Sequence, residues 1–253
     1  MDAYSDFSYV YDTFMDETPY EEWCEFLTET LQKNGIKEGL LLDLGCGTGT
    51  MTELLAQKGY DMIGIDMSDQ MLSVAMEKRE QSGYPILYLQ QDMREFELYG
   101  TVKAVVCVCD SVNYLLEEED ILETFELVNN YLDPDGIFIF DFNTVYKYAE
   151  VIGDATIAEN REDCSFIWEN FYEPEDQINE YDLTIFVKEE DDRYRKFTET
   201  HYQRGYTLET MRALVEEAGM IFVDAMDAET HGPVHEQSER IYVIAREQGK
   251  SCI

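Results

Sequence analysis

The fold of this chain is indicated by Leu40–Gly49, which reads LLLDLGCGTG. A mainly apolar, strand-like run leads directly into three glycines at alternate positions, and a helix-length amphipathic segment follows. Glycine at Gly45 and Gly47 permits a tight turn and lets a ligand approach the bare backbone, while Gly49 lets the next helix lie close to the strand. The spacing is G-x-G-x-G rather than the G-x-G-x-x-G of pyrophosphate-binding turns, so a ligand without a phosphate is favoured.

Short apolar runs alternate with helix-length segments from Leu40 to Phe142, a pattern typical of a parallel sheet covered by helices. We expect strands at Leu40–Leu44, Met62–Asp66, Ile86–Gln90, Val102–Cys109 and Ile137–Phe142, and helices at Thr50–Lys58, Ser68–Gln81 and Glu118–Asn130. Residues 134–136, Pro-Asp-Gly, are predicted to turn before the last of these strands. The sequence therefore predicts an α/β, Rossmann-like fold.

The pattern changes after Phe142, where Thr, Tyr, Phe and Ile alternate with polar residues. We expect antiparallel strands at Ser165–Glu173, Ile178–Glu189 and Arg193–Tyr206, then a helix at Leu208–Ala218 and strands at Ile221–Ala228 and Arg240–Arg246. The chain is accordingly divided into an N-terminal cover and core at residues 1–142, an inserted antiparallel β segment at 143–206, and a return to the core at 207–253.

The chain is strongly acidic, with 55 Asp and Glu against 18 Lys and Arg in 253 residues and a formal net charge of −37. Such a surface repels phosphate backbones and anionic lipid heads, and no block of basic residues offsets it. No apolar run approaches the ~18 residues of a membrane helix, and the first basic residue, Lys33, comes too late for a secretory signal. We therefore expect a cytoplasmic protein without nucleic-acid or membrane partners. The scattered cysteines and three histidines indicate neither a disulfide framework nor a metal site.

Acidic residues recur where three successive predicted strands end. Asp66 stands twenty-one residues after Gly45, at a position where an adenosine ribose would offer two hydroxyl donors to a carboxylate. After the third strand, Asp92 is suited to accept from an adenine amino group and Met93 to pack on the ring. The pair Cys109–Asp110 ends the fourth strand, at the carboxyl edge where open α/β sheets bind ligands.

Together these segments resemble the class I S-adenosylmethionine-dependent methyltransferases, over the region from Leu40 to Phe142 and the closing strands. The resemblance implies a seven-stranded sheet whose last strand is antiparallel, with S-adenosyl-L-methionine as the cofactor. It implies that Asp66 holds the ribose and that Asp43 orders the turn or meets the methionine moiety. The cofactor-binding residues implied in this part of the chain are Asp43, Gly45, Cys46, Gly47, Asp66, Met67, Asp92, Met93, Cys109 and Asp110.

The first 26 residues hold eight aromatics, about twice the share expected from the 13% of the whole chain. A helix stripe within Tyr20–Leu31 accounts for Trp23, whereas the aromatics of Tyr4–Tyr11 precede that helix. Aromatic faces attract a sulfonium cation, and an aromatic lid excludes water. The stretch resembles the N-terminal cover of glycine and amino-sugar N-methyltransferases. We therefore place Tyr20 and Trp23 at the cofactor and take Tyr11 as a candidate catalytic residue.

The densest polar and aromatic cluster of the insertion is Glu199–Tyr206, where the β segment rejoins the core. Similar small-molecule methyltransferases place acceptor-binding groups there. His201 is therefore a second candidate catalytic residue, and Arg204 a candidate for binding the substrate; ordinary cross-strand contacts are the alternative for both. We expect His231 and His235 on the surface.

Methyl transfer from a sulfonium needs alignment of the reactants and exclusion of water rather than a nucleophilic triad. We expect an enzyme that methylates the N or O atom of a small molecule, with His201 serving as a base if the acceptor is a hydroxyl. An RNA methyltransferase is less favoured, because Asp110–Asn113 reads DSVN where base N-methylation typically uses N-P-P-Y or D-P-P-Y. A non-catalytic cofactor-binding regulatory module stays open, as does the choice between a monomer and a homodimer.

Overall fold

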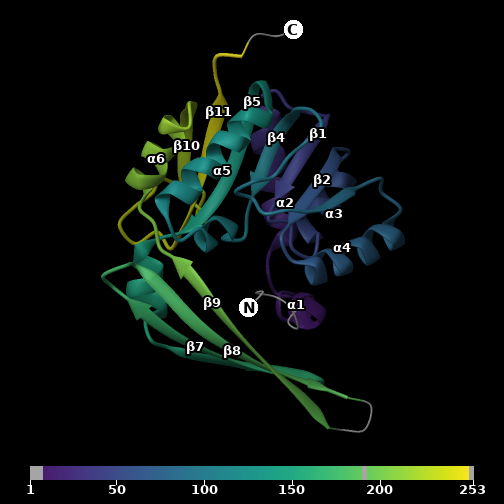
Figure 1. The fold of residues 1–253 in the computed structure, drawn as a ribbon, viewed down its shortest axis with the longest axis vertical. Helices are drawn as coiled ribbons and strands as arrows, with labels where there is room; N and C mark the ends of the chain where they lie inside the picture. The colour runs from purple at the N-terminus through teal and green to yellow at the C-terminus, as the bar shows by residue number, and fades with distance from the viewer. Residues whose placement is uncertain (1–7, 190–192, 251–253) are drawn as a thin grey trace.

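The computed structural model describes residues 8–189 and 193–250. Over these residues the strands form a seven-stranded sheet and a separate four-stranded sheet (Figure 1). The elements, in chain order, are α1 (Ser8–Phe14), α2 (Tyr20–Lys33), β1 (Leu40–Leu44), α3 (Thr50–Gln57), β2 (Asp61–Asp66), α4 (Asp69–Ser82), β3 (Leu87–Gln90), β4 (Val102–Cys107), η1 (Ser111–Tyr114), α5 (Glu118–Tyr131), β5 (Leu132–Asn143), η2 (Lys147–Ile152), β6 (Thr156–Asn160), β7 (Cys164–Glu173), β8 (Ile178–Lys188), β9 (Tyr194–Arg204), α6 (Leu208–Glu217), β10 (Met220–Asp227) and β11 (Arg240–Glu247).

The larger sheet has the strand order β10-β11-β5-β4-β1-β2-β3. The pairs from β3 to β5 are parallel, and β11 runs antiparallel to both of its neighbours. The smaller sheet is antiparallel throughout, in the order β6-β7-β8-β9. The predicted α/β fold, with its antiparallel last strand and its separate antiparallel β segment, is confirmed. No helix among the described residues is long and apolar enough to cross a membrane.

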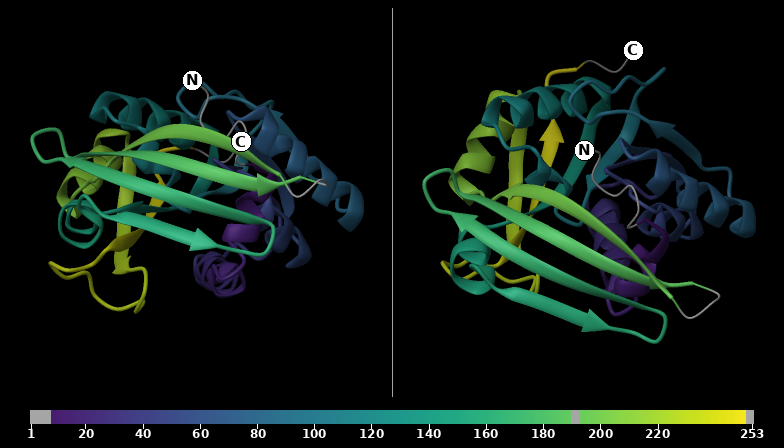
Figure 2. Two further views of the ribbon diagram at one scale, coloured as in Figure 1. Left: turned by 90° about the horizontal axis from the view of Figure 1, so that it is seen from below. Right: turned by 60° about the horizontal axis from the view of Figure 1, so that its bottom comes forward.

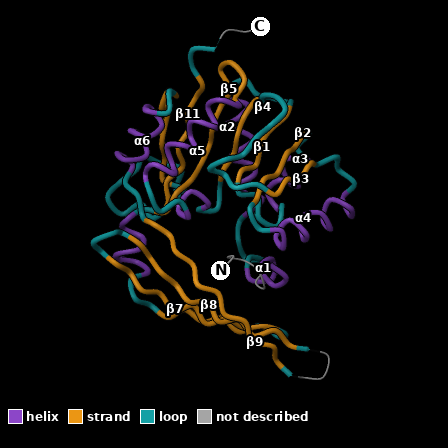
Figure 3. Tube along the Cα trace, viewed as in Figure 1, coloured by secondary structure: helices purple, strands orange, loops and turns teal. Residues whose placement is uncertain are grey.

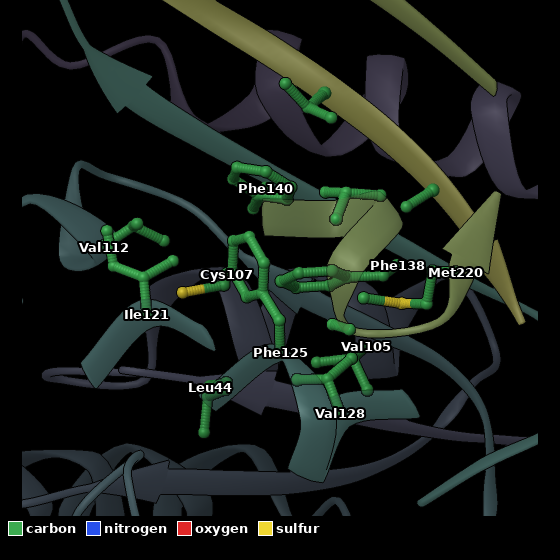
Figure 4. Close-up of a cluster of buried hydrophobic side chains, with 14 of the residues drawn as sticks. Leu44, Val105, Cys107, Val112, Ile121, Phe125, Val128, Phe138, Phe140 and Met220 are labelled. Atoms are coloured by element: carbon green, nitrogen blue, oxygen red, sulfur yellow. The ribbon is translucent and has the colours of Figure 1, made fainter. Parts of the chain in front are cut away.

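Alternate residues of the central strands pack against helices on opposite faces of the larger sheet. On one face Phe125 of α5 packs against both Phe138 and Phe140 of β5, with ring centroids 5.3 Å and 4.9 Å away (Figure 4). On the other face Val106 of β4 belongs to the cluster that contains Leu27 of α2. Because both faces are covered, the central strands are almost wholly apolar, as parallel strands usually are.

The smaller sheet lies beyond the carboxyl ends of the parallel strands, and α1 lies between it and the core (Figures 1 and 2). Val10 of α1 packs with Cys164 and Ile185 of this sheet, and the rings of Phe14 and Phe166 meet edge to face with centroids 4.8 Å apart. The tube in Figure 3 shows the long strands β7, β8 and β9 running side by side beneath α1. The carboxyl edge is therefore covered by a helix and by the inserted sheet.

Two local expectations from the sequence were wrong, and several elements were not predicted. Residues 134–136 do not turn before a strand; they belong to β5, whose pairing with β4 shifts register there, with Asp135 at a φ of 62°. The fourth strand ends at Cys107, because Cys109 and Asp110 adopt positive φ angles of 62° and 54°. The unpredicted elements include the helix α1 before Tyr20 and the strand β6 of the smaller sheet. The aromatics Tyr4 and Phe7 lie outside the described residues.

Candidate active site

A cavity of about 290 Å³ opens at the carboxyl ends of β1, β2 and β4. Its lining contains eleven of the residues selected from the sequence: Tyr11, Tyr20, Asp43, Gly45, Cys46, Gly47, Asp66, Met67, Asp92, Met93 and Cys109. The other four, Trp23, Asp110, His201 and Arg204, do not line it. Residues from α1 to η1, distant in sequence, thus converge on one cavity of the size that small-molecule ligands occupy.

The glycine turn after β1 presents bare backbone to this cavity. Gly45 and Gly47 have positive φ angles of 77° and 53°, which favour glycine. A Cβ on Gly45 would lie 2.7 Å from Ser111 Oγ, so that position is closed to larger residues. A Cβ on Gly47 would meet no protein atom within 4 Å, so the backbone there faces open space.

Asp66 closes the other side of the turn at the end of β2. Its Oδ2 accepts from the Gly47 amide at 2.8 Å and its Oδ1 from the Ser68 amide at 2.9 Å. Burial raises the pKa of this carboxyl above its usual range. A carboxylate has about four acceptor positions, so Asp66 retains capacity for a further donor from the cavity.

Asp43 lies on β1, two residues before Gly45, and joins this strand to α3. Its Oδ2 accepts from the Thr52 hydroxyl at 2.6 Å, and the side chain is buried. Burial raises the pKa of the Asp43 carboxyl to about 7, and the Thr52 hydrogen bond opposes that rise.

Asp92 lines the cavity beside Met93 and is held by Arg94, whose guanidinium lies 2.6 Å from its Oδ2. Hydrogen bonds from Arg94 hold the pKa of Asp92 below its usual range, so the residue is ionised. The guanidinium also reaches Asp120 at 3.3 Å, and this second contact fixes the ion pair at the rim.

The opposite end of the cavity is aromatic, with Tyr11 from α1, Tyr20 from α2 and Tyr114 from η1. Burial raises the pKa of both Tyr11 and Tyr20, and their side chains are hydrogen-bonded to each other. These phenols are therefore neutral, and their rings and hydroxyls form a wall that attracts a cation through ring faces. Cys109 lies beside them, and burial also raises the pKa of its thiol.

Asp110 joins the core to the inserted sheet instead of lining the cavity. Its Oδ1 pairs with Arg240 at 2.7 Å and its Oδ2 accepts from Gln203 Nε2 at 2.7 Å. The left-handed backbone at Cys109 and Asp110 is held by the buried Asp141 carboxylate, which accepts both amides at 3.1 Å and 2.7 Å. Arg240 also lies 5.3 Å from the ring centroid of Trp23, which places Trp23 behind the aromatic wall.

His201 and Arg204 lie on β9, beyond the cavity lining. His201 is buried, and its Nδ1 lies 3.2 Å from the hydroxyl of Tyr114, which does line the cavity. The guanidinium of Arg204 donates to the Leu116 carbonyl at 2.9 Å and lies 3.4 Å from Glu118. His231 and His235 are exposed.

Comparison with known proteins agrees with this geometry. The family model described as "Methyltransferase domain" matches residues 41–136. YqeM of Bacillus subtilis (strain 168), a protein that carries the name of a methyltransferase without a stated substrate, is 39% identical over 248 residues, covering 96% of each chain. The chain belongs to this methyltransferase family. A crystal structure of an S-adenosylmethionine-dependent methyltransferase from Clostridium acetobutylicum ATCC 824 superposes with a TM-score of 0.87 at 28% identity, covering 98% of this chain and all of that one.

Two further relatives of this methyltransferase match part of its length. Glycine/sarcosine N-methyltransferase of Halorhodospira halochloris is 29% identical over 119 residues, covering 46% of this chain and 44% of its own. dTDP-3-amino-3,4,6-trideoxy-alpha-D-glucopyranose N,N-dimethyltransferase of Streptomyces venezuelae is 33% identical over 102 residues, covering 40% and 41%. The protein is therefore an enzyme, its cofactor is S-adenosylmethionine, and the reading as a non-catalytic module is set aside.

The residues of the cavity fit this cofactor. Gly47 offers bare backbone, Asp66 offers a buried carboxylate, and Met93 offers an apolar surface in one continuous lining. When bound, S-adenosylmethionine supplies an electrophilic methyl group whose sulfur leaves as a neutral thioether.

Sequence reasoning missed three kinds of site residue. Tyr114 lies one position beyond the strand-end tetrad, and no spacing rule singles it out. Asp141 and Arg240 were read only as strand residues, although an acid inside the otherwise apolar run of β5 was a usable signal of a buried ion pair. Asp12 was not selected as a site residue, because its contacts lie on the distant glycine turn and on α4.

Proposed function

We propose that this methyltransferase transfers the methyl group to the nitrogen or oxygen of a small molecule, and that an amine is the better candidate. The observation that carries the proposal is the cavity itself, whose glycine and carboxylate end is continuous with a tyrosine-lined end. The cover by α1 and the inserted sheet supports a small acceptor, since a polymer would need an open groove.

The charges around the cavity support a neutral or cationic acceptor. Three cations near it are paired with carboxylates: Lys78 with Asp12 at 2.7 Å, Arg94 with Asp92 at 2.6 Å, and Arg240 with Asp110 at 2.7 Å. Lys147, near Arg240, donates to the Asn143 side chain at 3.0 Å instead. An acceptor whose carboxylate or phosphate met one of the three paired cations would have to break its ion pair. The net charge of −37 would meanwhile attract cations and repel RNA.

The protein side of the reaction consists of alignment, exclusion of water and removal of a proton. Tyr11 and Tyr20 would hold the methyl group beside their rings, and Asp66 would anchor the ribose. An amine that arrives as an ammonium must lose a proton before it can attack, and a hydroxyl must lose one during attack.

The test is to incubate the purified enzyme with ¹³C-methyl S-adenosylmethionine and two fractions of a cell extract, metabolites that pass a low-mass filter and total RNA. We expect a labelled methyl resonance in the metabolite fraction, at a carbon shift that distinguishes N-methyl from O-methyl. Heat-denatured enzyme is the blank. Label confined to RNA or to retained protein would contradict the proposal.

A further inference from the structure

Tyr114 connects the cavity to a buried polar chain on the inserted sheet. It stands on η1 and lines the cavity. Its hydroxyl lies 2.8 Å from the hydroxyl of Tyr181 on β8 and 3.2 Å from Nδ1 of His201 on β9. A proton that reaches the Tyr114 hydroxyl from the cavity therefore has an acceptor within hydrogen-bond distance.

His201 is held in one orientation from two further sides. Its ring is stacked on Tyr181, with centroids 4.8 Å apart and planes 7° from parallel. Its Nε2 lies 3.3 Å from Oε2 of Glu199, a charge contact without the geometry of a hydrogen bond, and both side chains are buried. The negative charge of this carboxylate favours the tautomer that carries its proton on Nε2, which leaves the Nδ1 lone pair facing the Tyr114 hydroxyl.

The strand pattern explains why these groups share one face. Side chains two apart on a strand point the same way, so Glu199 and His201 both face inward. Tyr181 is the cross-strand partner of His201. The intervening Thr200 and the next residue, Tyr202, lie on the other face, where Tyr202 is 44% exposed.

We propose that Tyr114 is the catalytic residue that takes the acceptor's proton, and that His201 and Glu199 are positioning residues that draw this proton out of the cavity. The inference rests on the proposed function, since it needs an acceptor with an N–H or O–H group. It changes the role expected for His201, which acts through Tyr114 rather than by touching the acceptor.

The proton balance is simple. The acceptor loses one proton and keeps the electron pair of that bond. Tyr114 Oη receives the proton while its own proton passes to His201 Nδ1, so Tyr114 ends unchanged and His201 becomes a cation beside the Glu199 carboxylate. No oxidant or reductant is needed, and solvent removes the proton when the cavity reopens.

The kinetic test uses the labelled metabolite found with the wild-type enzyme, and S-adenosylmethionine affinity measured by calorimetry. We expect Tyr114→Phe and His201→Ala to slow methyl transfer by about 100-fold, the lower range for general base catalysis, with cofactor affinity within about twofold of wild type. Tyr202→Phe, which removes a hydroxyl from the outer face of the same sheet, is the matched control. Wild-type rates in folded Tyr114→Phe would overturn the proposal.

The pH profile separates a relay from a packing role. The titratable side chains that contact His201 in the described structure are Tyr114 from η1, Tyr181 from β8 and Glu199 from β9. Glu199→Gln removes the negative charge that faces the cationic ring formed in the relay, so this variant should change the pH profile of the rate relative to wild type. A pH profile unchanged from wild type would contradict a role for Glu199.

A third measurement does not depend on any acceptor. In ¹⁵N spectra of the enzyme without cofactor, the neutral form of His201 should carry its proton on Nε2, and its Nδ1 shift should move toward the unbonded value in Tyr114→Phe. A proton on Nδ1 would overturn the relay even if metabolites are methylated. Label found only in RNA, together with the expected tautomer and shift, would instead refute the small-molecule proposal and leave the Tyr114–His201 contact standing.

Discussion

At the residue scale, we propose that the Asp66 side chain contributes to cofactor affinity. It accepts backbone amides and lines the cavity. We expect Asp66→Ala to weaken S-adenosylmethionine binding by about 1.5–3 kcal/mol, the value of hydrogen bonds to a charged group. Calorimetry measures it. Asp61→Ala, at the exposed opposite end of β2, is the control and should bind as the wild type does. Equal affinities in the two variants would remove Asp66 from the binding site.

Asp43 gives the enzyme a pH-dependent stability. Its pKa is about 7 in the fold, whereas an unfolded Asp has a pKa of about 3.9. Because the folded pKa is raised, the stability that protonated Asp43 contributes is lost as the pH rises toward 7. The side chain of Asp43→Asn cannot ionise, so this variant does not lose that stability. As the pH rises from about 5 to about 7, its unfolding free energy should increase relative to that of wild type by about 2–3 kcal/mol.

Urea unfolding of Asp43→Asn and wild type at several pH values measures this difference. Asp61→Asn, an exposed acid on the adjacent strand, is the control for loss of a charge. A difference between Asp43→Asn and wild type that stays constant with pH would show that Asp43 ionises normally in the fold.

At the element scale, α1 is a seven-residue helix that is held by its neighbours, since so short a helix is not stable alone. On the core side Asp12 accepts from the Thr48 hydroxyl at 2.7 Å and pairs with Lys78 at 2.7 Å. On the sheet side Asp16, two residues beyond the end of α1, pairs with Arg161 at 2.9 Å. The helix thus ties the cofactor turn to the inserted sheet.

We expect Asp12→Ala to loosen this helix and to speed cofactor release about threefold to tenfold. The lost ion pair and hydrogen bond are together worth about 1 kcal/mol. Stopped-flow displacement of S-adenosylmethionine measures the rate. The matched control is Thr13→Ala, a substitution at the next, exposed position of α1. Release at the wild-type rate from Asp12→Ala would mean that α1 does not gate the cavity.

At the scale of the whole molecule, we expect the acidic surface to destabilise the fold. A net charge of −37 on 253 residues repels itself, and salt screens that repulsion. Between about 0.1 M and 1 M salt the screening length falls from about 10 Å to about 3 Å. We expect the melting temperature to rise by about 4 °C or more in sodium chloride. Sorbitol at equal osmolality is the control, and an unchanged melting temperature in salt would contradict this view.

The sequence by itself predicted the order of the elements in the larger sheet, and it selected residues of the glycine turn and strand ends that line the cavity. Local patterns suffice there, because the period of the apolar residues distinguishes a strand from a helix. The positive φ angles of Gly45 and Gly47 likewise depend only on the turn itself and favour glycine. The strand ends then bring Asp66 and Asp92 to one edge, because parallel strands end on the same side.

Only the tertiary structure decided the contacts between the core and the inserted sheet. Asp110 has the right position in sequence, yet Arg240, 130 residues away, and Gln203 engage its carboxylate and tie it to the inserted sheet. Tyr114 meets His201 across 87 residues of sequence. Such contacts depend on how the smaller sheet packs over the core. Local propensity and spacing do not encode that packing, because the side chains of β9 alternate between its two faces in the same way wherever the sheet lies.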